Sequence, residues 1–146
     1  MSEIEAKDSL PKKPYAVRAL LVQESEILMI HHNFQDPKMF NKWTFPGGRL
    51  DPGENDPLQA LHREMDEELS LEIEVVGQVG VYYSRSGWDY TIFLARPLCP
   101  IGPLQPDEIR DVTWLTPAEI YEWHTKDRML FGFEMNVVSD YLKQFT

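Results

Sequence analysis

The sequence lacks the features that mark secreted and membrane-spanning chains. It has a single cysteine, Cys99, which excludes an internal disulfide and a cysteine-rich zinc site. No apolar run is long enough to cross a bilayer, and the polar segment 1–13 lacks the apolar stretch of a signal peptide. These absences predict a cytoplasmic protein with no membrane partner.

Positive charge is also scarce. The chain has 14 lysine and arginine residues against 24 aspartate and glutamate residues, a formal net charge of −10. An acidic surface repels the phosphate backbone, so we expect no binding to duplex nucleic acid. A small phosphate-bearing substrate is compatible with this charge where bound cations reverse the local sign.

The length of 146 residues suits one domain with a hydrophobic core. We expect a flexible N-terminal leader over residues 1–13, followed by a single domain over residues 14–146. A homodimer is compatible with this organisation. Apolar segments predict strands over residues 16–22, 27–30, 43–45, 73–81, 90–95 and 109–115, the first two as a hairpin.

Three segments have the spacing or capping signals of helices. They cover residues 57–69, residues 117–123 behind a capping box at Thr116, and residues 136–145. In the last of these, we expect Val137, Val138, Tyr141 and Leu142 to face inward. The order of strands and helices predicts a mixed α/β domain with a central sheet and helices on its faces.

The helix predicted at residues 57–69 has clear start signals and an apolar face. Asp56 suits the N-cap position and Pro57 the first helical position. Leu58, Leu61, Met65 and Leu69 then follow at helical spacing and predict one buried stripe.

The same helix carries carboxylates where a bare helix tolerates them least. Glu64, Glu67 and Glu68 fall within an arc of about 100°. Each like-charge pair three or four residues apart costs roughly 0.2–0.5 kcal/mol. The helix dipole also disfavours anions in the last turn. Arg63 offsets part of this repulsion through Glu67, at i+4.

A divalent cation would offset far more of this repulsion than Arg63 does. Carboxylate oxygens on one helical face are the hard ligands that Mg²⁺ and Mn²⁺ prefer. The alternative is a solvated acidic face, but the clustering after the glycine pair Gly47-Gly48 favours a metal site. These glycines allow the backbone to approach an ion or a phosphate closely, and a carbonyl of this loop is a further candidate ligand. Standing alone, the pair would indicate only a turn.

The segment from Gly48 to Leu71 resembles the Nudix box, the signature of the Nudix hydrolase superfamily. Gly48 and Glu54 match its opening spacing, and the run from Arg63 through Leu69 matches its core. There are two departures. Eight residues, not seven, separate Glu54 from Arg63, and Ser70 stands where the pattern has glycine. The extra residue, placed at 55–56, leaves the helical register intact but affects how Glu54 reaches the helix.

This resemblance implies an α/β/α sandwich around a mixed sheet. It also implies Mg²⁺- or Mn²⁺-dependent hydrolysis of the pyrophosphate linkage in a nucleoside diphosphate joined to another group, so the partner is a small nucleotide. The implied metal ligands are Glu64, Glu67, Glu68 and the carbonyl of Gly48, with Glu54 supporting the loop or binding metal through water. Arg63 would orient the glutamates, and Glu64 or Glu67 would be the general base.

Residues outside the box supply candidates for substrate recognition. The aromatic residues Tyr82, Tyr83, Trp88 and Tyr90 could stack on a base, or could simply belong to the core or rim. Of these, Tyr83 and Trp88, together with Arg49, are the predicted substrate-binding residues.

Two further polar sites remain open from the sequence. His31 and His32 end a predicted strand, where we expect solvent-exposed imidazoles more than substrate contacts. Glu108 is balanced between an additional ligand or base and an ordinary surface carboxylate.

Three rival interpretations remain. A non-catalytic Nudix-like module that binds or senses a nucleotide fits the two departures from the box, although the box glutamates are all present. A purely structural acidic domain would not respond to Mn²⁺. An isomerase on the same scaffold, if cysteine-dependent, would need a better placed residue than Cys99.

Overall fold

A computed structural model describes residues 16–84 and 87–146 of the chain. The predicted leader, residues 1–13, lies outside the described residues. Along the chain, the elements are β1 (Ala16–Gln23), β2 (Glu26–His32), the 3-10 helix η1 (Pro37–Met39), β3 (Trp43–Thr44), β4 (Gly47–Arg49), α2 (Pro57–Leu69), β5 (Ile73–Tyr83), β6 (Asp89–Pro97), β7 (Ile109–Leu115), α3 (Pro117–Thr125) and α4 (Glu134–Phe145). None of the described helices is both long and apolar enough to cross a membrane.

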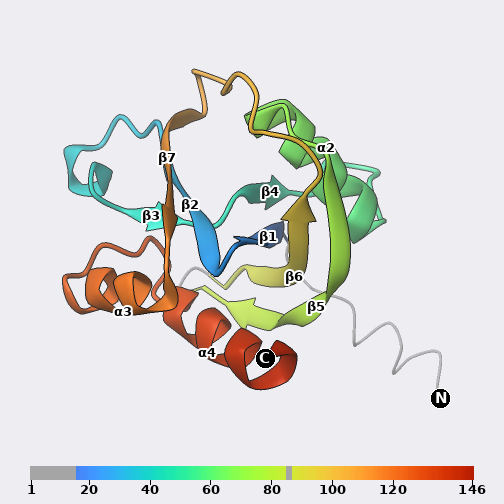
Figure 1. Cartoon of the computed structure of the whole chain (residues 1–146). Coiled ribbons are helices and arrows are strands. Elements are labelled where there is room, and N and C mark those ends of the chain that lie inside the picture. Colours follow the sequence, from blue (N-terminus) through green and yellow to red (C-terminus); the bar gives the residue numbers. More distant parts are fainter. Residues whose placement is uncertain (1–15, 85–86) are drawn as a thin grey trace, which may run out of the picture.

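The strands of the described chain form a mixed sheet in the order β3-β2-β1-β6-β5, while β4 pairs with β1 and β7 pairs with β2. The predicted hairpin is present as β1 and β2, and β1 also runs parallel to β6. Figure 1 shows α2 on one side of this sheet and α3 and α4 on the other. The predicted α/β/α architecture is therefore confirmed.

Alternation along β1 explains why both faces of the sheet are covered. Val17, Ala19 and Leu21 pack in the apolar cluster that contains the buried face of α2. Ala16 and Leu20 pack in the second cluster, with the buried residues of α3 and α4. Because successive side chains of a strand point to opposite faces, one nearly continuous apolar strand serves two cores.

Helix α2 begins and ends as its capping residues dictate. The Asp56 side chain accepts a hydrogen bond from the Leu58 amide at 3.0 Å, and Pro57 occupies the first turn. Ser70 takes the left-handed conformation at the C-cap, with φ 49° and ψ 47°, and its hydroxyl donates to the Pro103 carbonyl at 2.8 Å. Serine thus fills a position that usually favours glycine.

Two apolar positions were predicted to be more buried than they are. Leu58 is exposed, so the buried stripe of α2 begins at Ala60 and Leu61. Leu142 is also exposed, while Val137 and Val138 are fully buried in α4. Helical spacing predicts on which face of a helix a side chain lies. It does not predict whether another element packs against that face at the first or the last turn.

Candidate active site

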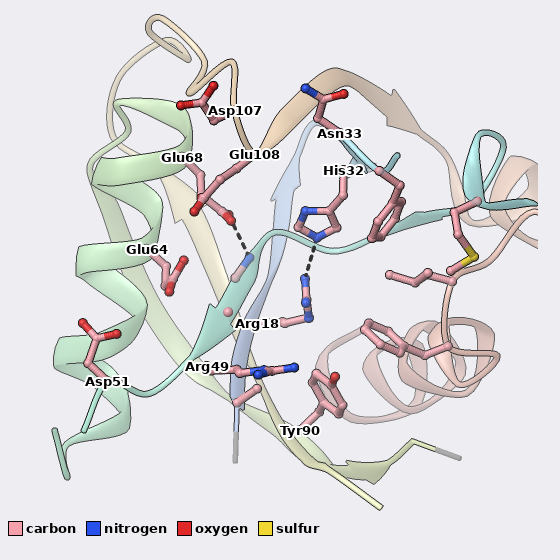
Figure 2. A pocket seen from close by; sticks show the side chains of 17 residues that line it. Arg18, His32, Asn33, Arg49, Asp51, Glu64, Glu68, Tyr90, Asp107 and Glu108 are labelled. Carbon is pink, nitrogen blue, oxygen red and sulfur yellow. Dashed lines mark hydrogen bonds between the residues drawn. The ribbon is translucent and has the colours of Figure 1, made fainter. Parts of the chain in front are cut away.

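Three carboxylates converge beside α2. Ligand oxygens of Glu64, Glu68 and Glu108 lie within 4.8 Å of one another. Glu64 and Glu68 are four residues apart on the face of α2 that packs against β1 and β4, and they are only 8% and 3% exposed. Glu108 approaches from the segment before β7, as Figure 2 shows. We call these three residues the acidic cluster.

The segment that carries Glu108 is attached to the end of α2. The amides of Gly102 and Gln105 donate to the carbonyls of Leu69 at 2.9 Å and Glu68 at 3.0 Å. These carbonyls belong to the last turn, which has no partners within its own helix. Gly102 is needed for the contact, because a Cβ there would lie 2.6 Å from the Cβ of Ser70. Glu108 is therefore positioned by α2 as well as by the sheet.

The two box glycines are required for different reasons. Gly47 has φ +146° and donates its amide hydrogen to Glu68 Oε1 at 3.2 Å. A Cβ at Gly47 would lie 2.2 Å from the Val17 carbonyl oxygen, within the pairing of β4 with β1. A Cβ at Gly48 would instead lie 2.6 Å from Glu64 Oε1. Gly47 thus permits the strand pairing, and Gly48 gives the Glu64 carboxylate its space.

Burial and mutual repulsion raise the pKa values of two members of the cluster, Glu64 and Glu68. Burial, reinforced by the charge of Glu64, raises the pKa of Glu68 to about 8, although Arg18 and the Gly47 amide oppose this shift. Burial likewise raises the pKa of Glu64, against the opposing effect of Arg63. Buried like charges at this spacing are relieved either by taking up a proton or by binding a cation. Three carboxylates form a hard-oxygen donor set, so the residues present fit Mg²⁺ or Mn²⁺.

Arg63 gathers the other box carboxylates at the edge of the cluster. Its guanidinium donates to both Glu54 oxygens at 2.8 and 3.0 Å, to Glu67 at 2.9 Å and to Glu64 at 3.3 Å. These hydrogen bonds are the main cause of the low pKa of Glu54, about 2. Despite the extra residue, Glu54 is joined to the helix. The predicted metal-binding roles of Glu54 and Glu67 stay predictions, since both side chains contact Arg63 and lie outside the acidic cluster.

The acidic cluster forms one wall of a cavity of about 620 Å³. This volume suits a small molecule the size of a nucleotide. The opposite part of the cavity has an aromatic and basic lining, here called the aromatic half, formed by Arg18, His32, Tyr90, Leu130 and Phe131. Figure 2 shows Arg18 between the acidic cluster and Tyr90.

The predicted substrate-binding residues lie at different distances from this cavity. Arg49 lines it, and its guanidinium lies 4.0 Å above the ring of Trp88. The Trp88 ring therefore packs against the Arg49 guanidinium. Tyr83 is 70% exposed and is not among the lining residues. Their roles in binding stay predictions, and Arg49 is the best placed of the three.

The interpretation of His31 and His32 as solvent-exposed is wrong. His31 is buried, with its ring in edge contact with Trp43 at 5.2 Å and hydrogen-bonded to the Phe40 carbonyl. His32 lines the cavity, where burial and the charge of Arg18 lower its pKa to about 4. The cause is topological: β2 is paired on both sides, with β3 and β7, so its last residues are covered.

Arg18 and Phe131 were not recognised from the sequence. Arg18 is the one charged residue in the apolar run of residues 16–22, and that isolation could have indicated a special role. Phe131 follows α3 and carries no comparable signal. Glu108, considered as an additional ligand or base, is the third member of the acidic cluster.

Comparison with known proteins agrees with this geometry. The family model for the NUDIX domain matches residues 12–132. The 8-oxo-dGDP phosphatase NUDT18 of Mus musculus is 36% identical over 84 residues, which cover 57% of this chain and 25% of that protein. The RNA pyrophosphohydrolase of Francisella tularensis subsp. mediasiatica is 38% identical over 66 residues, or 43% of this chain and 41% of that one. The chain thus spans less than half the length of either relative.

Solved structures show the same fold. The crystal structure of a NUDIX hydrolase from Nitrosomonas europaea superposes with a TM-score of 0.70 at 22% identity, covering 92% of this chain and 73% of that one. The resemblance of the segment from Gly48 to Leu71 to the Nudix box is confirmed. With the family model covering most of its length, the chain belongs to the Nudix hydrolase family.

Proposed function

We propose that the protein hydrolyses the pyrophosphate linkage of a nucleoside diphosphate joined to another group, with Mg²⁺ or Mn²⁺ as cofactor. The observation that carries this proposal is the convergence of Glu64, Glu68 and Glu108 on one wall of a nucleotide-sized cavity. Membership of the Nudix family supports it, as do the names of the relatives, which describe a nucleotide phosphatase and an RNA pyrophosphohydrolase.

In this mechanism, the acidic cluster and the Gly48 carbonyl would hold the cation. When bound, the cation neutralises phosphate oxygens and lowers the pKa of a coordinated water. If one box glutamate serves instead as the general base, Glu64 is better placed than Glu67 to accept the proton of the attacking water, because it lies within the cluster and burial raises its pKa above the ordinary value for glutamate. Arg63 keeps Glu64 and Glu67 in position through its hydrogen bonds.

The aromatic half would receive the nucleoside, with the phosphates directed to the acidic cluster. Its flat rings offer apolar contact area, and Arg49 is placed to contact a phosphate or the sugar. In water, the negative charge of a pyrophosphate repels nucleophiles, and a cation beside the phosphates would reduce this repulsion. Holding the nucleoside in the adjacent aromatic half would also fix the orientation of the linkage for in-line attack.

A substrate screen tests this function. We expect phosphate or pyrophosphate release from at least one member of a panel that spans nucleoside di- and triphosphates, oxidised nucleotides, dinucleoside polyphosphates and nucleotide sugars. Release should require Mg²⁺ or Mn²⁺ and disappear with chelator. Tight, saturable binding of a nucleotide without any turnover would favour the non-catalytic sensing module instead.

The stabilising effect of Mg²⁺ should grow as the pH rises from 6 to 9. Glu68 must lose its proton to bind a cation, and its pKa is raised to about 8. Below that pKa, each pH unit should weaken Mg²⁺ binding by about tenfold for this one proton, and above it the affinity should level off. Melting temperatures with and without Mg²⁺ across this range measure the effect. A metal-induced shift that is the same at pH 6 and pH 9 would contradict the assignment of Glu68.

A further inference from the structure

Ser70 ends α2 in an unfavourable backbone conformation. Its φ of 49° and ψ of 47° lie in the left-handed region, where a residue with a Cβ is less stable than glycine. Glycine is also the residue that the Nudix box has at this position. A strained residue of this kind calls for an explanation in what its side chain does.

The Ser70 side chain makes a contact that glycine could not make. Its hydroxyl donates to the Pro103 carbonyl at 2.8 Å, which joins the helix to a residue 33 positions further along the chain. Two backbone hydrogen bonds, from the amides of Gly102 at 2.9 Å and Gln105 at 3.0 Å, also join this segment to the last turn of α2. The hydroxyl therefore adds a third hydrogen bond between the end of α2 and residues 102–105.

A tight turn connects this attachment to Glu108. The Gln105 carbonyl accepts hydrogen bonds from the amides of Glu108 at 3.1 Å and Ile109 at 2.8 Å. The Gln105 side chain in turn accepts one from the Asp107 amide at 3.2 Å. Only four residues separate Pro103 from Glu108 in the sequence. Because the turn is closed by its own hydrogen bonds, a displacement of Pro103 would also displace Glu108.

Glu108 depends on its backbone for its position. Its side chain is exposed, whereas those of Glu64 and Glu68 are buried against the sheet. Packing therefore does little to hold the Glu108 carboxylate beside the other two. On the side of the sheet, Asn33 donates its side-chain amide to the Pro106 carbonyl at 3.0 Å. The attachment to α2 is the second point at which this turn is held.

Ser70 itself lies away from the cavity. It is exposed, and it is not among the described residues that line the cavity. Any influence of Ser70 on the site must therefore act through the segment that it holds. Since water competes for an exposed hydrogen bond, this influence should be moderate in size.

We infer that Ser70 is a positioning residue, whose hydroxyl holds residues 102–105 on α2 so that Glu108 stays beside Glu64 and Glu68. This inference rests on the function proposed above, in which the three carboxylates receive a divalent cation. In place of the favourable backbone that glycine would give, this chain has a hydrogen bond to the segment that carries Glu108.

Two substitutions separate the hydroxyl from the backbone strain. Ser70→Ala removes the hydroxyl and keeps the strain, so its melting temperature should fall by about 2–4 °C. Ser70→Gly removes both, and the relief of strain should keep its melting temperature close to that of the wild type. Both variants should bind Mn²⁺ about three- to tenfold more weakly, measured by calorimetry on the metal-free full chain. A role in stability alone predicts instead that Ser70→Gly binds Mn²⁺ as the wild type does.

Hydrogen exchange in the metal-free protein measures the attachment itself. In both variants, the amides of Gly102 and Gln105 should exchange about three- to tenfold faster than in the wild type. Thr125→Ala is the matched control, because it removes another exposed hydroxyl that donates to a carbonyl, that of Glu122 at 2.7 Å. It lies on α3, on the other side of the sheet from α2 (Figure 1), and should leave both measurements unchanged.

Neither measurement requires turnover, so the inference and the proposed function can fail separately. If the wild type binds Mn²⁺ but hydrolyses no nucleotide, the proposed function fails, and the two variants still decide the role of Ser70. The inference is overturned if both variants bind Mn²⁺ within about twofold of the wild type. Wild-type exchange rates at Gly102 and Gln105 in both variants would overturn it too, as would a wild-type protein that binds no Mn²⁺.

Discussion

Replacing Glu68 with glutamine is expected to lower kcat by about 10²–10³-fold while the protein stays folded. Glutamine has nearly the same shape and still accepts the Gly47 amide hydrogen, so the contact of α2 with β4 is kept. It cannot supply the negative charge that a divalent cation needs from this wall of the cavity. Steady-state kinetics with Mg²⁺, together with a thermal melt of the same preparation, measure the two effects.

The metal-free form of this variant should be more stable at alkaline pH than the wild type. The folded pKa of Glu68, about 8, lies above the value of 4.5 for a free glutamate. Its contribution to stability is therefore complete below pH 4.5 and is lost as the pH rises through 8. Glutamine has no charge to bury, so at pH 9 we expect its free energy of unfolding to exceed that of the wild type by roughly a few kcal/mol.

The combination of these two effects makes the test strict. A structural glutamate would give a variant that is less stable and less active in parallel. A Glu68→Gln protein with wild-type turnover would remove Glu68 from the site, and so would one whose Mg²⁺-induced rise in melting temperature is unchanged. Glu67→Gln is also expected to lower turnover, and comparing the two separates a residue of the acidic cluster from one held by Arg63.

Alanine at Gly48 should abolish most activity without unfolding the protein. The new Cβ would meet the end of the flexible Glu64 side chain at 2.6 Å, so the carboxylate moves and the backbone does not. We expect kcat/KM to fall by about 10–100-fold, as when a group that positions a metal ligand is disturbed, with a melting temperature close to that of the wild type.

The neighbouring substitution provides the control. Alanine at Gly47 would meet the backbone at Val17 and Arg18, and its φ of +146° is unfavourable for a side chain. Gly47→Ala should therefore be destabilised by about 2 kcal/mol or more in urea or thermal unfolding. If Gly48→Ala turned over substrate as fast as the wild type, the position of the Glu64 carboxylate beside Gly48 would not be needed for catalysis.

Local signals made much of the fold predictable. Asp56 and Pro57 set the start of α2, and the capping box at Thr116 and Glu119 sets the start of α3. The apolar segment 109–115 predicted β7 at its observed bounds, and helical spacing predicted the buried residues Leu61, Met65 and Leu69. Such signals depend only on residues a few positions apart in the chain, so they can be recognised in a single sequence without knowledge of the fold.

The rest of the site depends on contacts between distant segments. Glu108 reaches Glu64 only because the segment before β7 is attached to the end of α2. Arg18 meets Tyr90 because β1 runs parallel to β6. Neither pairing leaves a periodic trace in the sequence. The burial of His31 follows from strand pairing in the same way.

The attachment of the Glu108 segment to α2 has a mechanical consequence. Its hydrogen bonds to the last-turn carbonyls make the helix the common support of all three carboxylates. The carbonyl of Glu108 also accepts a hydrogen bond from the Asn33 amide at 2.8 Å, so the same segment joins the end of α2 to the end of β2. A displacement of α2 against the sheet would strain both attachments. The oxygen–oxygen spacings of the three carboxylates are therefore fixed by the helix and the sheet together.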